Sequence, residues 1–335
     1  MSSAQPMATT AYQQIFGILT GLSRSRAVGV AADLQLADLM ADGPVHVDVL
    51  AARTGTHAPS LFRLLRALAS IGIFAQVSPF VFGNSPSSEF LRQDVPGSLW
   101  AGARTQSALT ADAWIGLGAS IRSGKPAFDE VHGQNVWSFM RAHPDAAVVF
   151  DQSMRSLTGP MTPAVTAAYN WSRFPIIADI GGGIGTQLVS ILDAHPDCRG
   201  VLFDVPEVLG GAIPHGRLER HSGNFFEAVP TGADCYMLRM IIHDWPEPEA
   251  LRILSNVRNV MTQDSRLALI EMVIPDTTAA TLGFWTDLGM LVLCGGRERT
   301  AAEYKDLLSQ AGFEVDEIVA TASPFSIIVA VRRPN

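Results

Sequence analysis

The chain has 335 residues, enough for two domains, and 47% of them are hydrophobic while 17% are charged, as in packed globular proteins. Its net charge of −8 argues against nucleic-acid binding, which usually requires a basic surface. No apolar run reaches the ~18 residues of a membrane span, and no signal-peptide pattern opens the sequence. The three cysteines form no CxxC pair and the eight histidines show no metal-ligand spacing, so we expect a cytoplasmic protein without disulfides or a bound metal.

The first third of the chain is predicted to be helical. Apolar residues recur at helical spacing over 15–40, where two glycines interrupt the pattern, and again over 47–53. A longer helix lies between Pro59 and Gly72, and residues 74–82 alternate as in a β-hairpin around Ser78-Pro79. Helix, turn, helix and hairpin together are the layout of a winged helix.

Winged helices bind DNA or serve as packing and dimerisation modules. From 47 to 100 there are four Arg and no Lys against two Asp and one Glu, less phosphate-binding charge than a groove-reading helix carries. We therefore expect dimerisation, and a small-molecule-sensing DNA-binding regulator is the less favoured alternative.

The segment over 106–170 is predicted to be a helical linker that contributes to a substrate pocket. It is rich in large apolar and sulfur-containing side chains: Trp114, Phe128, Trp137, Phe139, Met140, Phe150, Met154 and Met161. Most of these belong in a core, but methionine and aromatic side chains also line adaptable small-molecule pockets.

From Pro175 onward, short apolar runs alternate with helical patterns, which predicts a doubly wound, mostly parallel sheet of the α/β class. The predicted strands are 176–180, 200–203, 234–237, 266–271 and 326–331, and the predicted helices include 247–261 and 301–311. We expect a domain boundary near 169–174, so that the linker separates domains over 1–105 and 171–335.

A glycine loop, DIGGGIGT, follows the first of these strands and begins at Asp179. Its spacing fails the G-x-G-x-x-G pattern of nicotinamide cofactors, and it has no Walker lysine. An acidic residue before the glycines suits a cationic ligand better than a pyrophosphate. Asp204, at the tip of the next strand, can accept both hydroxyls of a ribose. These features indicate an adenosine-bearing cation such as S-adenosylmethionine.

The sequence also resembles the plant-type small-molecule O-methyltransferases and their bacterial relatives over nearly its whole length. The matching stretches are ADIGGGIGTQL, LFDVPEV, SGNFFEAVP, MLRMIIHDWPEPEALRILSNV, LIEMVIPD and DLGMLVLCGGRERTAAEYKDLLSQAGF. The resemblance implies a winged-helix domain that forms a homodimer and a Rossmann-like domain that binds S-adenosylmethionine. It also implies O-methylation of a small aromatic molecule.

The resemblance further implies roles for individual residues. His243 would be the general base, and Glu271 and Glu298 would orient it. The cofactor would contact Asp179, Gly181, Asp204, Asn224, Phe225, Arg239, Trp245 and Met154, and the acceptor would contact Phe150, Asp287 and Met290. Asn224 stands where the family usually has aspartate, so its bond to adenine would lack a full charge.

The chemistry of these residues fits methyl transfer to a hydroxyl. A phenol, with a pKa near 10, is a poor nucleophile at pH 7, and a histidine with a pKa near 6.5 can remove its proton. A carboxylate on the far ring nitrogen would fix the tautomer. One further alternative stays open, a methyltransferase-fold enzyme that decarboxylates, hydroxylates or closes rings instead.

Overall fold

The computed structural model describes residues 4–334, with side chains from residue 10 onward. The chain forms two compact units, one from residues 1–115 and 137–158 and the other from 116–136 and 159–335. The segment over 106–170, predicted as a linker, is therefore divided between both units.

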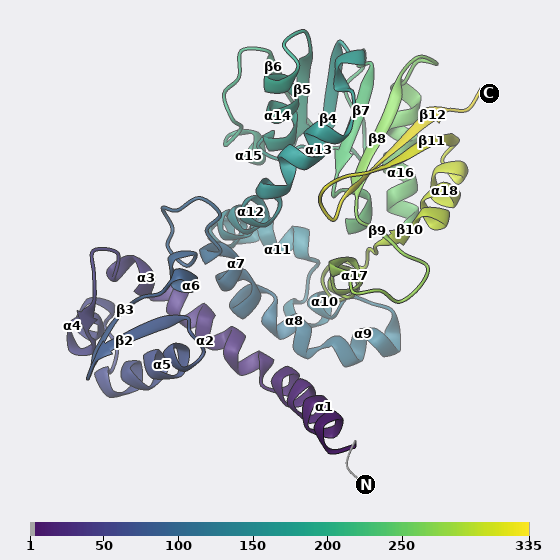
Figure 1. The fold of residues 1–335 in the computed structure, drawn as a ribbon. Helices are drawn as coiled ribbons and strands as arrows, with labels where there is room; N and C mark the ends of the chain where they lie inside the picture. Colours follow the sequence, from purple (N-terminus) through teal and green to yellow (C-terminus); the bar gives the residue numbers. More distant parts are fainter. Residues whose placement is uncertain (1–3, 335) are drawn as a thin grey trace. The chain divides into compact units, whose positions relative to one another are not determined.

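The first unit contains a winged helix (Figure 1). Its helices are α3 (Leu36–Leu39), α4 (Val47–Thr54) and α5 (Ala58–Ser70), and its strands β1 (Val45–His46), β2 (Phe74–Ser78) and β3 (Val81–Asn84) form an antiparallel sheet in the order β1-β3-β2. Gly55 and Gly72, which follow α4 and α5, both have positive φ, a conformation that glycine adopts without steric cost. The predicted helices and hairpin are confirmed.

The first unit contains further helices, and two of them approach each other closely at one glycine. These further helices are α1 (Ala4–Leu19), α2 (Gly21–Asp33), α6 (Pro86–Glu89), α7 (Trp100–Arg104), the π-helix Thr105–Leu109, α8 (Ala111–Ile115), α11 (Val136–Ala142) and α12 (Pro144–Thr158). The predicted helix over 15–40 is divided at Gly21, where α2 begins, but the predicted interruption at Gly29 is wrong because Gly29 lies inside α2. A Cβ there would lie 2.1 Å from Cβ of Ser107, so the glycine allows α2 to approach the π-helix.

The second unit is built on a seven-stranded sheet in the order β11-β12-β8-β7-β4-β5-β6. The strands are β4 (Ile176–Ile180), β5 (Arg199–Asp204), β6 (Leu218–Ser222), β7 (Cys235–Arg239), β8 (Arg266–Glu271), β11 (Phe313–Ala320) and β12 (Ser326–Arg332). Neighbours from β8 to β6 are parallel, and β12 runs antiparallel to β8 and β11. The predicted doubly wound, mostly parallel α/β sheet is confirmed.

Helices cover both faces of this sheet (Figure 1). Side chains of α16 (Glu247–Val260) and α18 (Ala301–Gln310) share one apolar core with the sheet, and those of α13 (Thr162–Ala168) and α14 (Thr186–Ala194) share the other. The unit also contains α9 (Leu117–Ser123), α10 (Ala127–His132), α15 (Pro206–Leu209), α17 (Leu282–Leu293) and the paired short strands β9 (Val273–Ile274) and β10 (Arg299–Thr300). Among the described residues, no helix is both long and apolar enough to cross a membrane.

Two strands of the large sheet are not among the predicted ones. β6 carries a single aliphatic residue, Leu218, because it is an edge strand with mostly exposed side chains. β11 has a register shift between Val315 and Glu317, and the shift breaks the alternation that the sequence pattern relies on. Both strands therefore lack the periodic signal of a half-buried strand.

The close contact at Gly29 gives a first prediction. We expect Gly29→Ala to lower the free energy of unfolding by about 1–3 kcal/mol, because the new methyl group overlaps Ser107. Gly21→Ala is the matched control, since no atom lies within 4 Å of the added Cβ. Urea unfolding measured by circular dichroism checks both, and equal stability of the two variants would contradict the contact.

Candidate active site

The carboxyl ends of four parallel strands meet at one edge of the large sheet. They bring Asp179 (β4), Asp204 (β5), Arg239 (β7) and Glu271 (β8) to the same edge. This edge is where open α/β sheets bind their ligands. Residues that are far apart in sequence thus come together here because of the strand order.

The glycine loop after β4 is shaped by backbone geometry that side chains would obstruct. Gly181, Gly183 and Gly185 all have positive φ, and a Cβ on Gly181 would lie 2.6 Å from Cδ1 of Ile241 and 3.4 Å from the ring of Phe225. The carboxylate of Asp204 accepts hydrogen bonds from the backbone N–H groups of Gly183 at 2.8 Å and Val205 at 2.7 Å. The loop and the tip of β5 are therefore held together.

Asp179 is a buried carboxylate with one oxygen that accepts no hydrogen bond from a described residue. Its side chain is 1% exposed, and its Oδ1 has no hydrogen-bond partner among the described residues. Burial raises the pKa of Asp179 to about 7, against the opposing charge of Arg239. Arg239 donates to Thr162 Oγ1 at 3.0 Å, and burial lowers its own pKa to about 10. A cationic ligand beside Asp179 would offset the cost of burying this carboxylate.

Aromatic rings lie next to the glycine loop. Phe225 and Phe226 both make edge contacts with Trp245, at centroid distances of 6.0 and 4.7 Å. Asn224 accepts from the backbone N–H of Phe226 at 3.0 Å and donates to Glu227 at 3.1 Å. This second bond requires an amide, because the aspartate usual in the family could not donate it.

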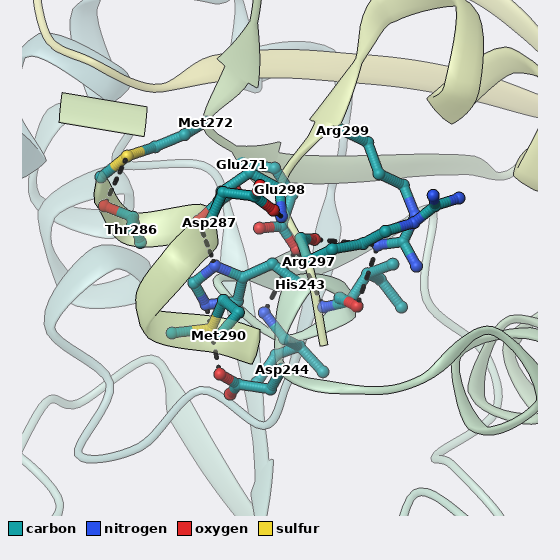
Figure 2. Close-up of polar contacts among 12 residues, drawn as sticks. His243, Asp244, Glu271, Met272, Thr286, Asp287, Met290, Arg297, Glu298 and Arg299 are labelled. Atoms are coloured by element: carbon teal, nitrogen blue, oxygen red, sulfur yellow. Dashed lines mark hydrogen bonds and ion pairs between the residues drawn. The ribbon is translucent and has the colours of Figure 1, made fainter. Parts of the chain in front are cut away.

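His243 lies in a single 3-10 turn, Ile242–Asp244, and is 2% exposed. Its Nδ1 is 2.7 Å from Glu298 Oε1, and its Nε2 is 3.4 Å from Asp244 Oδ1 (Figure 2). The short contact at Nδ1 fits a ring N–H that donates to a carboxylate, which leaves Nε2 as the nitrogen that can gain or lose a proton.

Glu271 acts on the backbone rather than on the ring. Its Oε1 accepts from the N–H groups of Ile242 at 2.9 Å and Ile241 at 3.3 Å. Glu271 is fully buried, and burial raises its pKa to about 7 although the charge of His243 opposes this. It therefore fixes the turn that carries His243.

The segment after α17 packs directly on the backbone of His243 (Figure 2). Arg297 N–H donates to His243 O at 2.8 Å, and a Cβ on Gly296 would lie 1.9 Å from that oxygen. The N–H of Glu298 donates to Asp287 Oδ1 at 2.9 Å. Asp287, predicted to line the acceptor pocket, thus holds the residue that binds the imidazole.

The electrostatics of this cluster favour a charged imidazole. Burial alone would lower the pKa of His243, but Asp244, Glu271 and Glu298 outweigh it and raise the pKa to about 10. The pKa of Asp244 is itself raised to about 6 by burial, in spite of the charge of His243. The cluster thus carries an excess of carboxylates over cations and favours a positively charged partner.

His243, Glu271 and Glu298 place three potential metal-ligand atoms within 4.8 Å of one another. The 2.7 Å contact between Nδ1 and Oε1 is a hydrogen-bond distance, so a shared proton accounts for the closest pair. The arrangement therefore does not require a metal ion.

Comparison with known proteins agrees with this geometry. Residues 114–314 match the family described as "O-methyltransferase domain", and residues 16–94 match "O-methyltransferase dimerisation domain". The chain belongs to the O-methyltransferase family.

Individual relatives cover the chain almost completely. The phenazine O-methyltransferase PhzM of Lysobacter antibioticus is 36% identical, over 98% of this chain and 97% of its own length. A phenazine-1-carboxylate N-methyltransferase of Pseudomonas aeruginosa is 32% identical, over 96% and 98%. Among solved structures, NcsB1 from neocarzinostatin biosynthesis, in complex with S-adenosylmethionine and 2-hydroxy-5-methyl naphthoic acid, has 31% identity and a TM-score of 0.84, over 94% of this chain and 98% of that one.

The predicted site residues of this O-methyltransferase-family chain fall into two groups. Those of the second unit gather at the carboxyl edge and around His243, and Met290 lies on α17 next to Cys294, with 3.7 Å between the two sulfur atoms. Phe150 and Met154 lie on α12 of the first unit. The functional roles of the residues in both groups stay predictions.

Sequence reasoning missed Asp244 and Arg299. Asp244 follows His243 directly, and Arg299 follows Glu298, so both lay inside motifs that had been recognised. Only the fold shows that Asp244 reaches Nε2 and that Arg299 is fully buried.

Proposed function

We propose that this chain is an S-adenosylmethionine-dependent O-methyltransferase that acts on a hydroxyl group of a small aromatic natural product, with His243 as general base. The observation that carries the proposal is the buried His243 whose Nδ1 is bound by Glu298 at 2.7 Å. A hydroxyl must lose its proton to become a good nucleophile, and this arrangement presents the opposite nitrogen for that purpose.

The residues at the carboxyl edge fit S-adenosylmethionine. Asp179 offers a buried carboxylate oxygen without a described partner, Gly181 keeps the approach clear, and Asp204 stands at the tip of β5 where a ribose is bound in such sheets. Phe225 and Trp245 supply apolar surface for the adenine. When bound, the cofactor supplies an electrophilic methyl group on a sulfonium.

His243 performs the proton chemistry of the proposed mechanism. Its Nε2 takes the proton of the acceptor hydroxyl, while Nδ1–H donates to Glu298, whose charge stabilises the imidazolium that forms. Glu271 keeps the turn at Ile242 in place, and Asp287 keeps the backbone of Glu298 in place. Holding the hydroxyl in line with the methyl group could lower the activation free energy by up to ~7–11 kcal/mol, more than the base itself.

N-methylation is the second candidate, because a relative with 32% identity is an N-methyltransferase. An aromatic ring nitrogen has a free electron pair and needs no base, so the His243–Glu298 pair favours a hydroxyl acceptor. Decarboxylation, hydroxylation or ring closure would consume a substrate without adding a methyl group.

The test is turnover by the His243→Ala variant. A panel of hydroxylated phenazines, naphthoates and aminobenzoates is incubated with S-adenosylmethionine, and products are identified by mass. We expect one added methyl group on oxygen for the wild type and a loss of about 10²- to 10⁴-fold in kcat for His243→Ala. Calorimetry should show unchanged cofactor affinity, and full turnover by the variant would refute the base role.

A second prediction follows from the raised pKa of His243. A positively charged sulfonium near His243 would repel the imidazolium and lower its pKa. Binding of S-adenosylmethionine should therefore release protons from His243. S-adenosylhomocysteine carries the same ammonium but no sulfonium and is the matched ligand. Titration calorimetry at about pH 8.5, in buffers of different ionisation enthalpy, should show more protons released by the charged cofactor. Equal release by both ligands, or a difference that persists in His243→Gln, would contradict this.

We also propose that the chain forms a homodimer through its first unit. α1 exposes several large apolar side chains, among them Ile15 (57% exposed), Ile18 (67%) and Leu19 (75%), and the dimerisation-domain match begins at residue 16. An exposed apolar surface of this kind marks an interaction site.

Light scattering tests the dimer. The wild type should have the mass of two chains, and the double variant Ile15→Asp/Leu19→Asp should be a monomer, because two charges cannot be buried unpaired. Val77→Asp, which places a charge at an exposed hairpin residue, should remain a dimer. A monomeric wild type would disprove the proposal.

A further inference from the structure

Arg299 is a cation buried beside the proposed base. It lies in β10, is 0% exposed, and forms no ion pair within 4.0 Å among the described residues. Its Nη1 donates to the carbonyl oxygens of Ile242 and Arg297, each at 3.3 Å, while its Nε and Nη2 donate to no described atom. Burying a guanidinium with so few bonds is costly unless nearby charge offsets the cost.

The bond from Arg299 means that both backbone polar groups of Ile242, the residue before His243, are bound by side chains. The N–H of Ile242 donates to Glu271 on β8, and its carbonyl accepts from Arg299 on β10. Two oppositely charged side chains from different strands thus hold both polar groups of one residue's backbone. Hydrogen bonds in which one partner is charged are stronger than those between neutral groups. The two bonds to Ile242 therefore fix the turn that carries the His243 side chain.

The charged and titratable groups around His243 come from five segments. They are Asp244 on its own turn, Glu271 on β8, Glu298 just before β10 and Arg299 in it, Tyr304 on α18, and Asp287 in α17 with Cys294 just after its end. Of these, Arg299 alone carries a permanent positive charge. The guanidinium also lies 5.9 Å from the ring centre of Tyr304.

We propose that Arg299 is a positioning residue for the base. It holds the turn that carries His243, and its positive charge opposes the preference of the surrounding carboxylates for the imidazolium. This inference rests on the proposed role of His243. It assigns to Arg299 two effects that a merely structural arginine would not combine, one on geometry and one on proton affinity.

The experiment compares Arg299→Met, Arg299→Lys and a matched control. The control is Arg217→Met, since Arg217 also donates to backbone carbonyls, those of Leu192, His195 and Cys198, but lies at the amino ends of the strands. The titration midpoint of His243 is followed by nitrogen NMR in histidine-labelled protein saturated with S-adenosylhomocysteine. Loss of the signal in His243→Gln identifies it among the eight histidines.

We expect Arg299→Met to raise the midpoint by about one pH unit, because a positive charge has been removed, and Arg217→Met to leave it unchanged. The acid limb of the kcat profile, measured with a turned-over compound of the panel, should move upward by the same amount. An unchanged midpoint in a folded Arg299→Met variant, with S-adenosylhomocysteine still bound, would overturn the proposal.

If Arg299→Met does not fold, Arg299→Lys carries the test. Lysine keeps the charge but cannot reproduce the fork of donors, so we expect the midpoint of the wild type and a kcat lowered about tenfold or more. A wild-type kcat in Arg299→Lys would refute the positioning role. Turnover by His243→Ala would instead refute the proposed base, and the NMR comparison would still report whether Arg299 affects the proton affinity of His243.

Discussion

The hydrogen bond between His243 and Glu298 joins side chains that are 55 residues apart and belong to different segments beside the sheet. For the two atoms to lie 2.7 Å apart, the turn after β7 and the segment after α17 must be held in one relative position. Glu271 binds the first of these segments, Asp287 binds the second, and Arg297 N–H joins them. Gly296 is required at this point because any side chain would separate the two backbones.

The same constraint explains why so much charge is buried in one place. Each carboxylate that orients His243 also stabilises its protonated form, which is the form that cannot act as a base. A site of this kind needs compensating positive charge, either built into the protein or brought by a ligand. Arg299 is the built-in cation next to the turn, and the cation that we propose for the carboxyl edge, beside Asp179, would come with the cofactor. Orientation and basicity are thus balanced against each other.

Much of the fold could be predicted because its signals are local. Continuous apolar runs such as those of β4 and β8 indicate buried strands, and the positive-φ glycines after α4 and α5 end helices where expected. β6 and β11 were missed because the exposed edge strand has no apolar run and the register shift breaks the alternation of a half-buried strand. Gly29 shows the opposite error, since a glycine that reads as a helix breaker serves a close contact with Ser107 that no local pattern reveals.

The site shows the same division at the level of single residues. The resemblance to a family indicated His243, Glu271 and Glu298 as site residues. It did not indicate which group each of the two carboxylates binds. Asp287 was expected to contact an acceptor, which stays a prediction; its Oδ1 lies 2.9 Å from the backbone N of Glu298. Glu271 accepts from backbone N–H groups instead of binding the ring. Bonds from side chains to distant backbone groups leave no mark in a sequence pattern, because every residue offers the same N–H and C=O. For that reason, residues that act by holding a backbone, Arg299 among them, can be recognised only once the strands are in register.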